Sequence, residues 1–188
     1  MESEIVNWDW ANSILYNMCE DEPKHTDVNI TVGKLNIIGR TYSATIERGA
    51  GSNFKILEVA KKINDSAVDM LLERIRLFNI PNKENIEDIL EVHKYFTDIL
   101  FEVTGLNKRS LASKYLHFHA PEAFFIYDSI ANKKIREELT NKKFKVLNKY
   151  NKKYDKEYAN FVYRCLYFRD NFHKGKSPRD IDKVLLGY

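Results

Sequence analysis

The residues best suited to chemistry lie in one stretch of the chain, 105–135, and the central one is Asp128. The segment Ile126-Tyr127-Asp128-Ser129 leaves an apolar run and enters a predicted helix. Backbone N–H groups in the first turn of a helix have no intrahelical partner, so they are free to bind a phosphate or to orient a carboxylate. Asp128 is therefore predicted to be either a fixed negative charge in a site or an ordinary helix N-cap.

The predicted helix before Asp128 carries a possible cationic partner. Its apolar face is formed by Leu111, Tyr115 and Phe118, and a polar face by Ser110, Lys114 and His117. We expect the polar face to point outward and residues 121–126 to reverse the chain, so that Asp128 lies within reach of Lys114. A lysine paired with an acid across a cleft is typical of acid–base chemistry, and a solvated helix face is the alternative.

Metal and nucleotide sites have little support in the sequence. His117 and His119 are two positions apart, which places their side chains about 200° apart on a helix, so both cannot face one ion unless the helix has ended there. No GxxxxGK[ST] or GxGxxG motif occurs. Cys19 and Cys165 lie among apolar neighbours, which favours buried thiols over a disulfide or a nucleophile. We predict neither a metal nor a cofactor.

Length and composition predict one compact all-α domain over residues 1–188. The 188 residues are 44% hydrophobic and include seven glycines and four prolines, and most apolar residues recur every three or four positions. The formal charge of +3 permits a polyanionic partner without requiring one. No run approaches the roughly 18 apolar residues of a membrane span, and the acidic first residues are unlike a secretory leader. We expect a cytoplasmic monomer that does not bind membranes.

Helical periodicity divides the chain into predicted helices. They are expected over residues 4–19, 27–48, two within 54–78, 86–103, two within 105–135, 154–172 and 181–188. Gly105 is predicted to cap the end of one helix, and Asp65 and Ser177 to cap the starts of two others. Residues 141–156, rich in lysine and tyrosine, are predicted to form a mobile basic flank.

The stretch Gly105-Leu106-Asn107-Lys108-Arg109 is followed by a helix, a hairpin with Pro121 and an acid that enters a further helix at Asp128. This pattern resembles the motif of the helix-hairpin-helix DNA glycosylases. In those enzymes a glycine-containing hairpin grips the DNA backbone, and an aspartate roughly two dozen residues later drives base release. Asp128 follows Gly105 by 23 positions. The resemblance covers about thirty residues, and Asn107 stands where the family has a second glycine.

The resemblance implies that Asp128 is the counterpart of the catalytic aspartate, with Lys114 as its partner. Members that also nick DNA keep a lysine early in the helix after the hairpin, and the ungapped position here is Arg109. Arginine stays protonated and is a poor Schiff-base nucleophile. Lys108 and Lys114 could replace it only if the hairpin is shifted. We therefore expect a monofunctional glycosylase that uses water.

Such an enzyme needs a pocket for a flipped base and cations for the DNA backbone. The pocket is predicted to draw on Trp8, Arg40, Tyr42, Glu47, Arg48 and His117. The backbone contacts are predicted at Lys108, Arg109, Ser110, Lys133 and Lys134. Arg40 and Glu47 are seven positions apart and are expected to share a helix face. The alternatives are a core position for each aromatic residue and a surface ion pair for Arg40 and Glu47.

Two functional hypotheses follow from these patterns. The first is a small DNA glycosylase that removes a damaged or modified base; by analogy alone, it would act in prokaryotic defence against phages with modified DNA. The second is a non-catalytic helical module that binds DNA or a partner protein, in which Asp128 is only an N-cap.

Overall fold

A computed structural model of the protein describes residues 8–78, 80–140 and 153–187. These residues form nine helices and no strand, which confirms the predicted all-α fold. The helices are α1 (Asp9–Asp21), α2 (Val28–Thr41), α3 (Ile56–Asn64), α4 (Val68–Arg76), α5 (Ile86–Thr104), α6 (Arg109–His119), α7 (Ser129–Glu138), α8 (Lys156–Phe172) and α9 (Pro178–Leu186). None of the helices in these ranges is long and apolar enough to cross a membrane.

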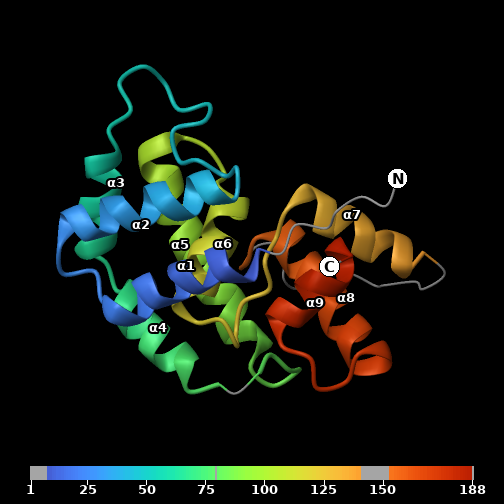
Figure 1. Ribbon diagram of the computed structural model, residues 1–188. Helices are drawn as coiled ribbons and strands as arrows, with labels where there is room; N and C mark the ends of the chain where they lie inside the picture. Colours follow the sequence, from blue (N-terminus) through green and yellow to red (C-terminus); the bar gives the residue numbers. More distant parts are fainter. Residues whose placement is uncertain (1–7, 79, 141–152, 188) are drawn as a thin grey trace.

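Two hydrophobic clusters divide the described residues into two lobes (Figure 1). In the first lobe α6 packs against α1, α2 and α5, while α3 and α4 pack against α5, and the cluster includes Leu35 and Phe96. In the second lobe α7, α8 and α9 pack together around residues such as Tyr158. Helix α5 joins the lobes, because Leu90 near its start belongs to the second cluster and Phe96 to the first.

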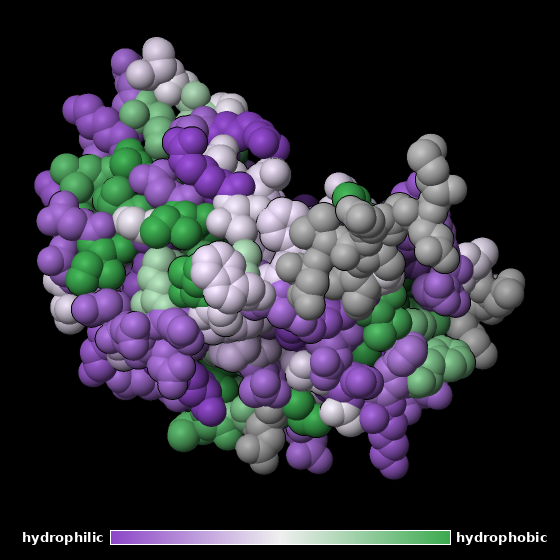
Figure 2. Space-filling model, in the orientation of Figure 1, coloured by the Kyte–Doolittle hydropathy of each residue, from purple (hydrophilic) through white to green (hydrophobic). Residues whose placement is uncertain are grey.

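The surface of the molecule is mainly hydrophilic. On the face that Figure 2 shows, hydrophobic side chains lie in small groups among hydrophilic ones. The larger apolar side chains that are exposed are spread over several helices, as Trp10 on α1, Met70 on α4 and Phe101 on α5 illustrate. Apolar residues scattered in this way are usual on the surface of a protein, so they do not by themselves indicate a docking face.

Local sequence signals account for several helix ends. Gly105 adopts the left-handed conformation at φ 66° and caps α5, as predicted. The predicted start at Ser177 is also confirmed, because Ser177 and Asp180 form a reciprocal capping box with Pro178 in the first turn of α9. Cys19 and Cys165 are free and buried, as predicted.

Two predicted boundaries were wrong. The helix expected over 27–48 ends at Thr41, and the chain then turns through Ser43 at φ 51°, so Arg48 is not helical. Asp65 is the C-cap of α3 rather than an N-cap. At the start of α4 the next residue, Ser66, takes the capping role, since its side chain accepts the hydrogen bond from the N–H of Val68. The predicted helix start at residue 4 and residues 141–152 of the predicted basic flank lie outside the described ranges.

The segment between α6 and α7 runs back along α6 and is held there by side chains of that helix. The Tyr127 carbonyl accepts from Lys114 Nζ at 2.9 Å, and the Phe124 carbonyl accepts from His117 Nδ1 at 2.8 Å. The returning segment covers the polar face of α6, so Lys114 is 1% exposed and His117 is 0% exposed. The expectation that this face points outward was therefore wrong, whereas the expected reversal of the chain is confirmed.

Candidate active site between the two lobes

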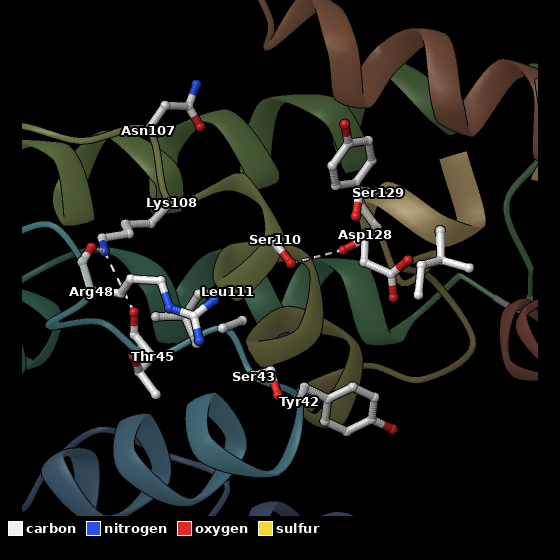
Figure 3. Close-up of a pocket in the computed structure, with 13 residues that line it drawn as sticks. Tyr42, Ser43, Thr45, Arg48, Asn107, Lys108, Ser110, Leu111, Asp128 and Ser129 are labelled. Carbon is white, nitrogen blue, oxygen red and sulfur yellow. Dashed lines mark hydrogen bonds between the residues drawn. The ribbon is translucent and has the colours of Figure 1, made fainter. Parts of the chain in front are cut away.

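A cavity of about 520 Å³, termed here the Asp128 cavity, opens where the two lobes meet. Its lining comes from three segments: 42–48 after α2, 107–111 at the start of α6 and 127–130 at the start of α7. Arg48 and Lys108 lie on one side, and Asp128 on the other (Figure 3). The volume lies within the range of roughly 300–1,000 Å³ that is common for ligand pockets.

Asp128 is the N-cap of α7 and part of the cavity wall. Its Oδ1 accepts a hydrogen bond from the Ala131 N–H at 2.8 Å, which confirms the predicted helix start. Its Oδ2 lies 3.8 Å from Lys114 Nζ, and the side chain remains 28% exposed. Asp128 is thus a carboxylate whose orientation is fixed from two sides and which still faces the cavity.

Lys114 supports that carboxylate from behind. Its Nζ donates to Ser110 Oγ and to the Tyr127 carbonyl, each at 2.9 Å, and pairs with Asp128. Burial lowers the pKa of Lys114, and the carboxylates of Asp128 and Asp182 oppose this effect. Two of its ammonium protons are donated in these hydrogen bonds, the contact with Asp128 at 3.8 Å is an ion pair, and Lys114 does not line the cavity. The lysine therefore orients Asp128 and does not itself face a bound molecule.

The two cations of the predicted hairpin are used within the protein. Lys108 Nζ donates to the carbonyl of Arg48 at 2.5 Å and of Thr45 at 3.4 Å. Arg109 Nε donates to Asp155 Oδ1 at 2.6 Å. Burial raises the pKa of Asp155, but the hydrogen bonds from Arg109, the Tyr158 N–H and Asn107, together with the Arg109 charge, outweigh burial and bring the pKa down to about 2. A DNA phosphate would have to compete with these internal partners for either cation.

Several predicted residues do meet at the cavity. Tyr42, Arg48, Lys108, Ser110 and Asp128 all line it, although they come from three separate segments. The Tyr42 hydroxyl donates to Asn12 Oδ1 at 2.6 Å. The Tyr42 ring lies 5.6 Å from Lys114 Nζ, so one aromatic face is turned towards the lysine. Arg48 is exposed at the cavity.

Three residues predicted for the pocket lie elsewhere on the surface. Trp8 is 49% exposed at the start of α1 and belongs neither to the core nor to the cavity lining. Arg40 pairs with Glu47 at 3.1 Å, with side chains 69% and 41% exposed. The predicted proximity is real, but the pair spans the turn after α2 and does not share a helix face, because α2 ends at Thr41.

The other predicted site residues are also away from the cavity. His117 Nδ1 donates to a carbonyl, so Nε2 accepts from the Tyr16 hydroxyl at 2.7 Å. Burial lowers the pKa of His117 to about 4, and the ring is closed to a substrate. Lys133 and Lys134 are exposed on α7, where Lys133 lies 3.8 Å from Glu137.

Two acidic residues near the site were missed from the sequence. Asp155 caps α8, and its place directly before that helix is a signal that could have been read. Asp182 lies on α9, is 3% exposed and accepts from Arg179 Nη1 at 2.5 Å. Nothing local in the sequence places α9 beside α7, so the position of Asp182 is known only from the fold.

In the described part of the chain, no group of three or more His, Cys, Asp or Glu side chains is arranged to hold a metal ion. Comparison of the chain with models of protein families, with curated proteins and with solved structures found no match. The geometry of the Asp128 cavity is therefore the basis for any functional proposal.

Proposed function

We propose that the chain is a DNA glycosylase that hydrolyses the N-glycosidic bond of a damaged or modified base. The observation that carries the proposal is the Lys114–Asp128 pair, at 3.8 Å, in the wall of a cavity of about 520 Å³. Cleavage of this bond places positive charge on the sugar, and a pre-oriented carboxylate is the group that stabilises such a charge. The resemblance of residues 105–135 to the helix-hairpin-helix glycosylases supports the same reaction.

In the proposed reaction a nucleotide is flipped from the duplex so that its sugar C1′ lies beside Asp128. The C1′–N bond breaks with its electron pair going to the base, which takes up a proton from solvent; Asp128 returns an equivalent proton to solvent after the water has attacked. A water oxygen then bonds to C1′ and releases its proton to the Asp128 carboxylate, giving a free base and an abasic sugar. Because the Lys114 ammonium has three internal partners, its role is to hold Asp128 in place, which favours water over a lysine nucleophile.

The proposed partner is DNA, and the protein is proposed to act as a monomer in the cytoplasm. Arg48 is exposed at the cavity, and Lys133 and Lys134 are exposed on α7, the helix that Asp128 caps. These cations are suited to phosphates on either side of a flipped nucleotide. Each phosphate contact should make the slope of log K against log salt more negative by about 0.9.

The test is excision of bases from a panel of DNA substrates. Oligonucleotides carrying oxidised, deaminated, alkylated or hydroxymethylated bases, and genomic DNA of phages with modified bases, are incubated with the protein and treated with alkali to cut abasic sites. We expect at least one substrate to be cleaved, and Asp128→Asn to reduce the rate by about 10²–10³-fold. Asparagine is also a good N-cap, so the fold should be retained.

Asp27→Asn is the matched control, because Asp27 caps α2 as Asp128 caps α7 and its carboxylate accepts from the Asn29 N–H at 2.7 Å. It should leave the rate unchanged. The same capping geometry at Asp128 favours a second candidate, a non-catalytic DNA- or protein-binding module. That candidate is supported if no substrate yields product and Asp128→Asn binds DNA normally. Covalent capture of DNA by borohydride would contradict the water route.

A further inference from the structure

A second cavity, of about 450 Å³ and termed here the α7 cavity, lies beside the Asp128 cavity. Its lining comes from residues between 127 and 140, most of them on α7, and from Glu157 at the start of α8. Tyr127 and Ser129 line both cavities, so the two are neighbours at the start of α7. The reaction proposed for the Asp128 cavity makes no use of the α7 cavity.

The Glu157 carboxylate is held in the α7 cavity through one of its two oxygens. Its Oε1 accepts from the Tyr127 hydroxyl at 3.1 Å and from Asn132 Nδ2 at 3.2 Å. Glu157 lies in the first turn of α8, where a negative charge is favourable, and the residue is exposed. Its Oε2 has no hydrogen-bond partner among the described residues. The carboxylate therefore has a fixed orientation and a second oxygen that can accept from a ligand.

Asn132 lacks a partner in the same cavity. The residue is 8% exposed and lines the α7 cavity, and its Nδ2 donates to Glu157 and to the Tyr127 hydroxyl. Its Oδ1 is buried and has no hydrogen-bond partner in the part of the chain that the structure describes. A buried amide oxygen without a partner costs free energy, so packing alone does not explain it. A ligand with N–H groups would supply the missing donors.

The α7 cavity also carries cations. Arg136 and Lys133 line it, and both are exposed. Lys133 lies 3.8 Å from Glu137, whereas the Arg136 guanidinium forms no ion pair within residues 8–78, 80–140 and 153–187. A guanidinium binds a phosphate well, because it can donate two parallel hydrogen bonds. The cavity thus combines a cation for a phosphate with acceptors for N–H donors, and a nucleotide offers both groups.

We propose that the α7 cavity is a second nucleotide subsite, which binds the unpaired nucleotide next to the flipped one, with its phosphate at Arg136 and its base at Glu157 and Asn132. The inference rests on the proposed glycosylase function, since one DNA strand supplies both nucleotides. Guanine is the favoured base, because N1–H and the N2 amino group place two donors side by side on its pairing edge. Thymine is disfavoured, because the carboxylate repels the two carbonyl oxygens that flank its N3–H.

The first test measures nucleotide binding and needs no excision. The ¹⁵N-labelled protein is titrated with dGMP and with dTMP, and the NMR signals of the Asn132 side-chain amide report binding in the α7 cavity. We expect dGMP to bind at least about tenfold more tightly than dTMP. Glu157→Gln keeps an oxygen for Tyr127 and Asn132 but places an amide donor where Oε2 was, so it should abolish the preference.

Glu138→Gln is the matched control, because it removes the same charge from an exposed residue of α7 that does not line the cavity. It should keep the preference for dGMP. Equal binding of the two nucleotides to the wild type, or a preference that survives in Glu157→Gln, would overturn the proposal. Arg136→Met should weaken both nucleotides by the same factor. Unchanged binding of both nucleotides in Arg136→Met would also overturn it, because the phosphate would then lie elsewhere.

The second test measures excision from single-stranded oligonucleotides that carry guanine or thymine beside the modified base. With guanine on one side of that base, kcat/KM should be about tenfold higher than with thymine there, and Glu157→Gln should remove the difference. Excision at equal rates beside both bases would overturn the subsite and retain the glycosylase. A preference for dGMP in the NMR titration without excision of any base would retain the subsite and reject the glycosylase.

Discussion

Two buried lysines, Lys34 on α2 and Lys114 on α6, are equally shielded from solvent but have different kinds of partner. Each is 1% exposed, and burial lowers the pKa of both. Lys34 Nζ donates to the carbonyl of Glu22, the C-cap of α1, and to His119 Nε2 at 3.3 Å. A cation at the C-terminal end of a helix is stabilising. Lys114 instead lies 3.8 Å from Asp128, a carboxylate that faces a cavity.

The surroundings of Lys34 would look catalytic from residue types alone. His25 lies 2.5 Å from Asp69 through Nδ1 and 2.7 Å from the Tyr115 hydroxyl through Nε2, and its ring stacks on His119. These contacts join the segment before α2 to α4 and α6, and the His25 side chain is 0% exposed. An acid–histidine–hydroxyl chain is therefore used here for packing. Exposure of the carboxylate does not separate the two sites, because the Asp69 side chain is 30% and the Asp128 side chain 28% exposed. What sets the Lys114 site apart is that its carboxylate lines the Asp128 cavity.

The sharpest test of this difference exchanges each lysine for methionine. Lys114→Met should reduce base excision by about 10²-fold, because Asp128 loses the cation that fixes it. Lys34→Met, equally buried, should leave the rate per folded molecule unchanged. Both rates are measured on one substrate, with the folded fraction taken from circular dichroism. Equal loss of activity in both variants would show that Lys114 has no role in base excision beyond the structural role that Lys34 also has.

Acid should affect the two regions in opposite directions. Burial lowers the pKa of His25 and His119 in the fold below the usual 6.5, so the unfolded chain takes up protons first and stability falls as pH drops below about 6.5. Asp182 has a raised pKa of about 6, so its contribution to stability increases as pH falls from 6 towards 4. A pKa that differs by one between the folded and unfolded chain corresponds to about 1.4 kcal/mol.

Urea unfolding at several pH values between 7.5 and 5 measures how the free energy of unfolding changes with pH. His25→Gln should make the loss of stability on acidification shallower, because it removes a histidine that takes up a proton more readily in the unfolded chain than in the fold. Asp182→Asn should make it steeper, since the contribution that offsets the histidines is removed. Parallel slopes in the two variants would contradict the assigned protonation states.

The sequence could predict features that depend on neighbouring residues. Helical periodicity located the helices, Gly105 ended α5, and the approach of Lys114 to Asp128 followed from a reversal of the chain between them. Each depends on hydrogen bonds or side-chain spacing within about twenty residues. The end of α2 at Thr41 was missed because its apolar stripe continues to Tyr42, and a stripe marks the buried face without marking the last helical turn.

Features that depend on distant segments could not be predicted. The polar face of α6 is buried because a later segment covers it, and a helix with polar residues on one side gives no sign of such a cover. Asp182 lies on α9, which packs on α7, the helix that Asp128 caps some fifty residues earlier. Lys108 and Arg109 suit DNA phosphates by type, but the fold supplies them with carbonyl and carboxylate partners.

Lys108 combines features of both buried lysines and gives the smallest expected effect. Like Lys34 it donates to backbone carbonyls, those of Thr45 and Arg48, but it lines the Asp128 cavity, whose wall also carries the carboxylate that pairs with Lys114. If the role of a lysine is set by its hydrogen-bond partners in the free protein, the role of Lys108 is to hold segment 42–48. Lys108→Met should then lower the free energy of unfolding by about 1 kcal/mol and loosen that segment. KM should then rise severalfold while the salt dependence of DNA binding stays the same.

Arg48→Met is the control for that measurement, because Arg48 is exposed at the same cavity. It should make the slope of log K against log salt less negative by about 0.9, the value for one lost phosphate contact. If Lys108→Met changes the slope by the same amount, Lys108 exchanges its carbonyl partners for a phosphate when DNA binds. In that case the distance of a lysine from the cavity, and not its hydrogen-bond partners in the free protein, determines whether it takes part in DNA binding. The difference between Lys34 and Lys114 would then also have to be explained by their distances from the cavity.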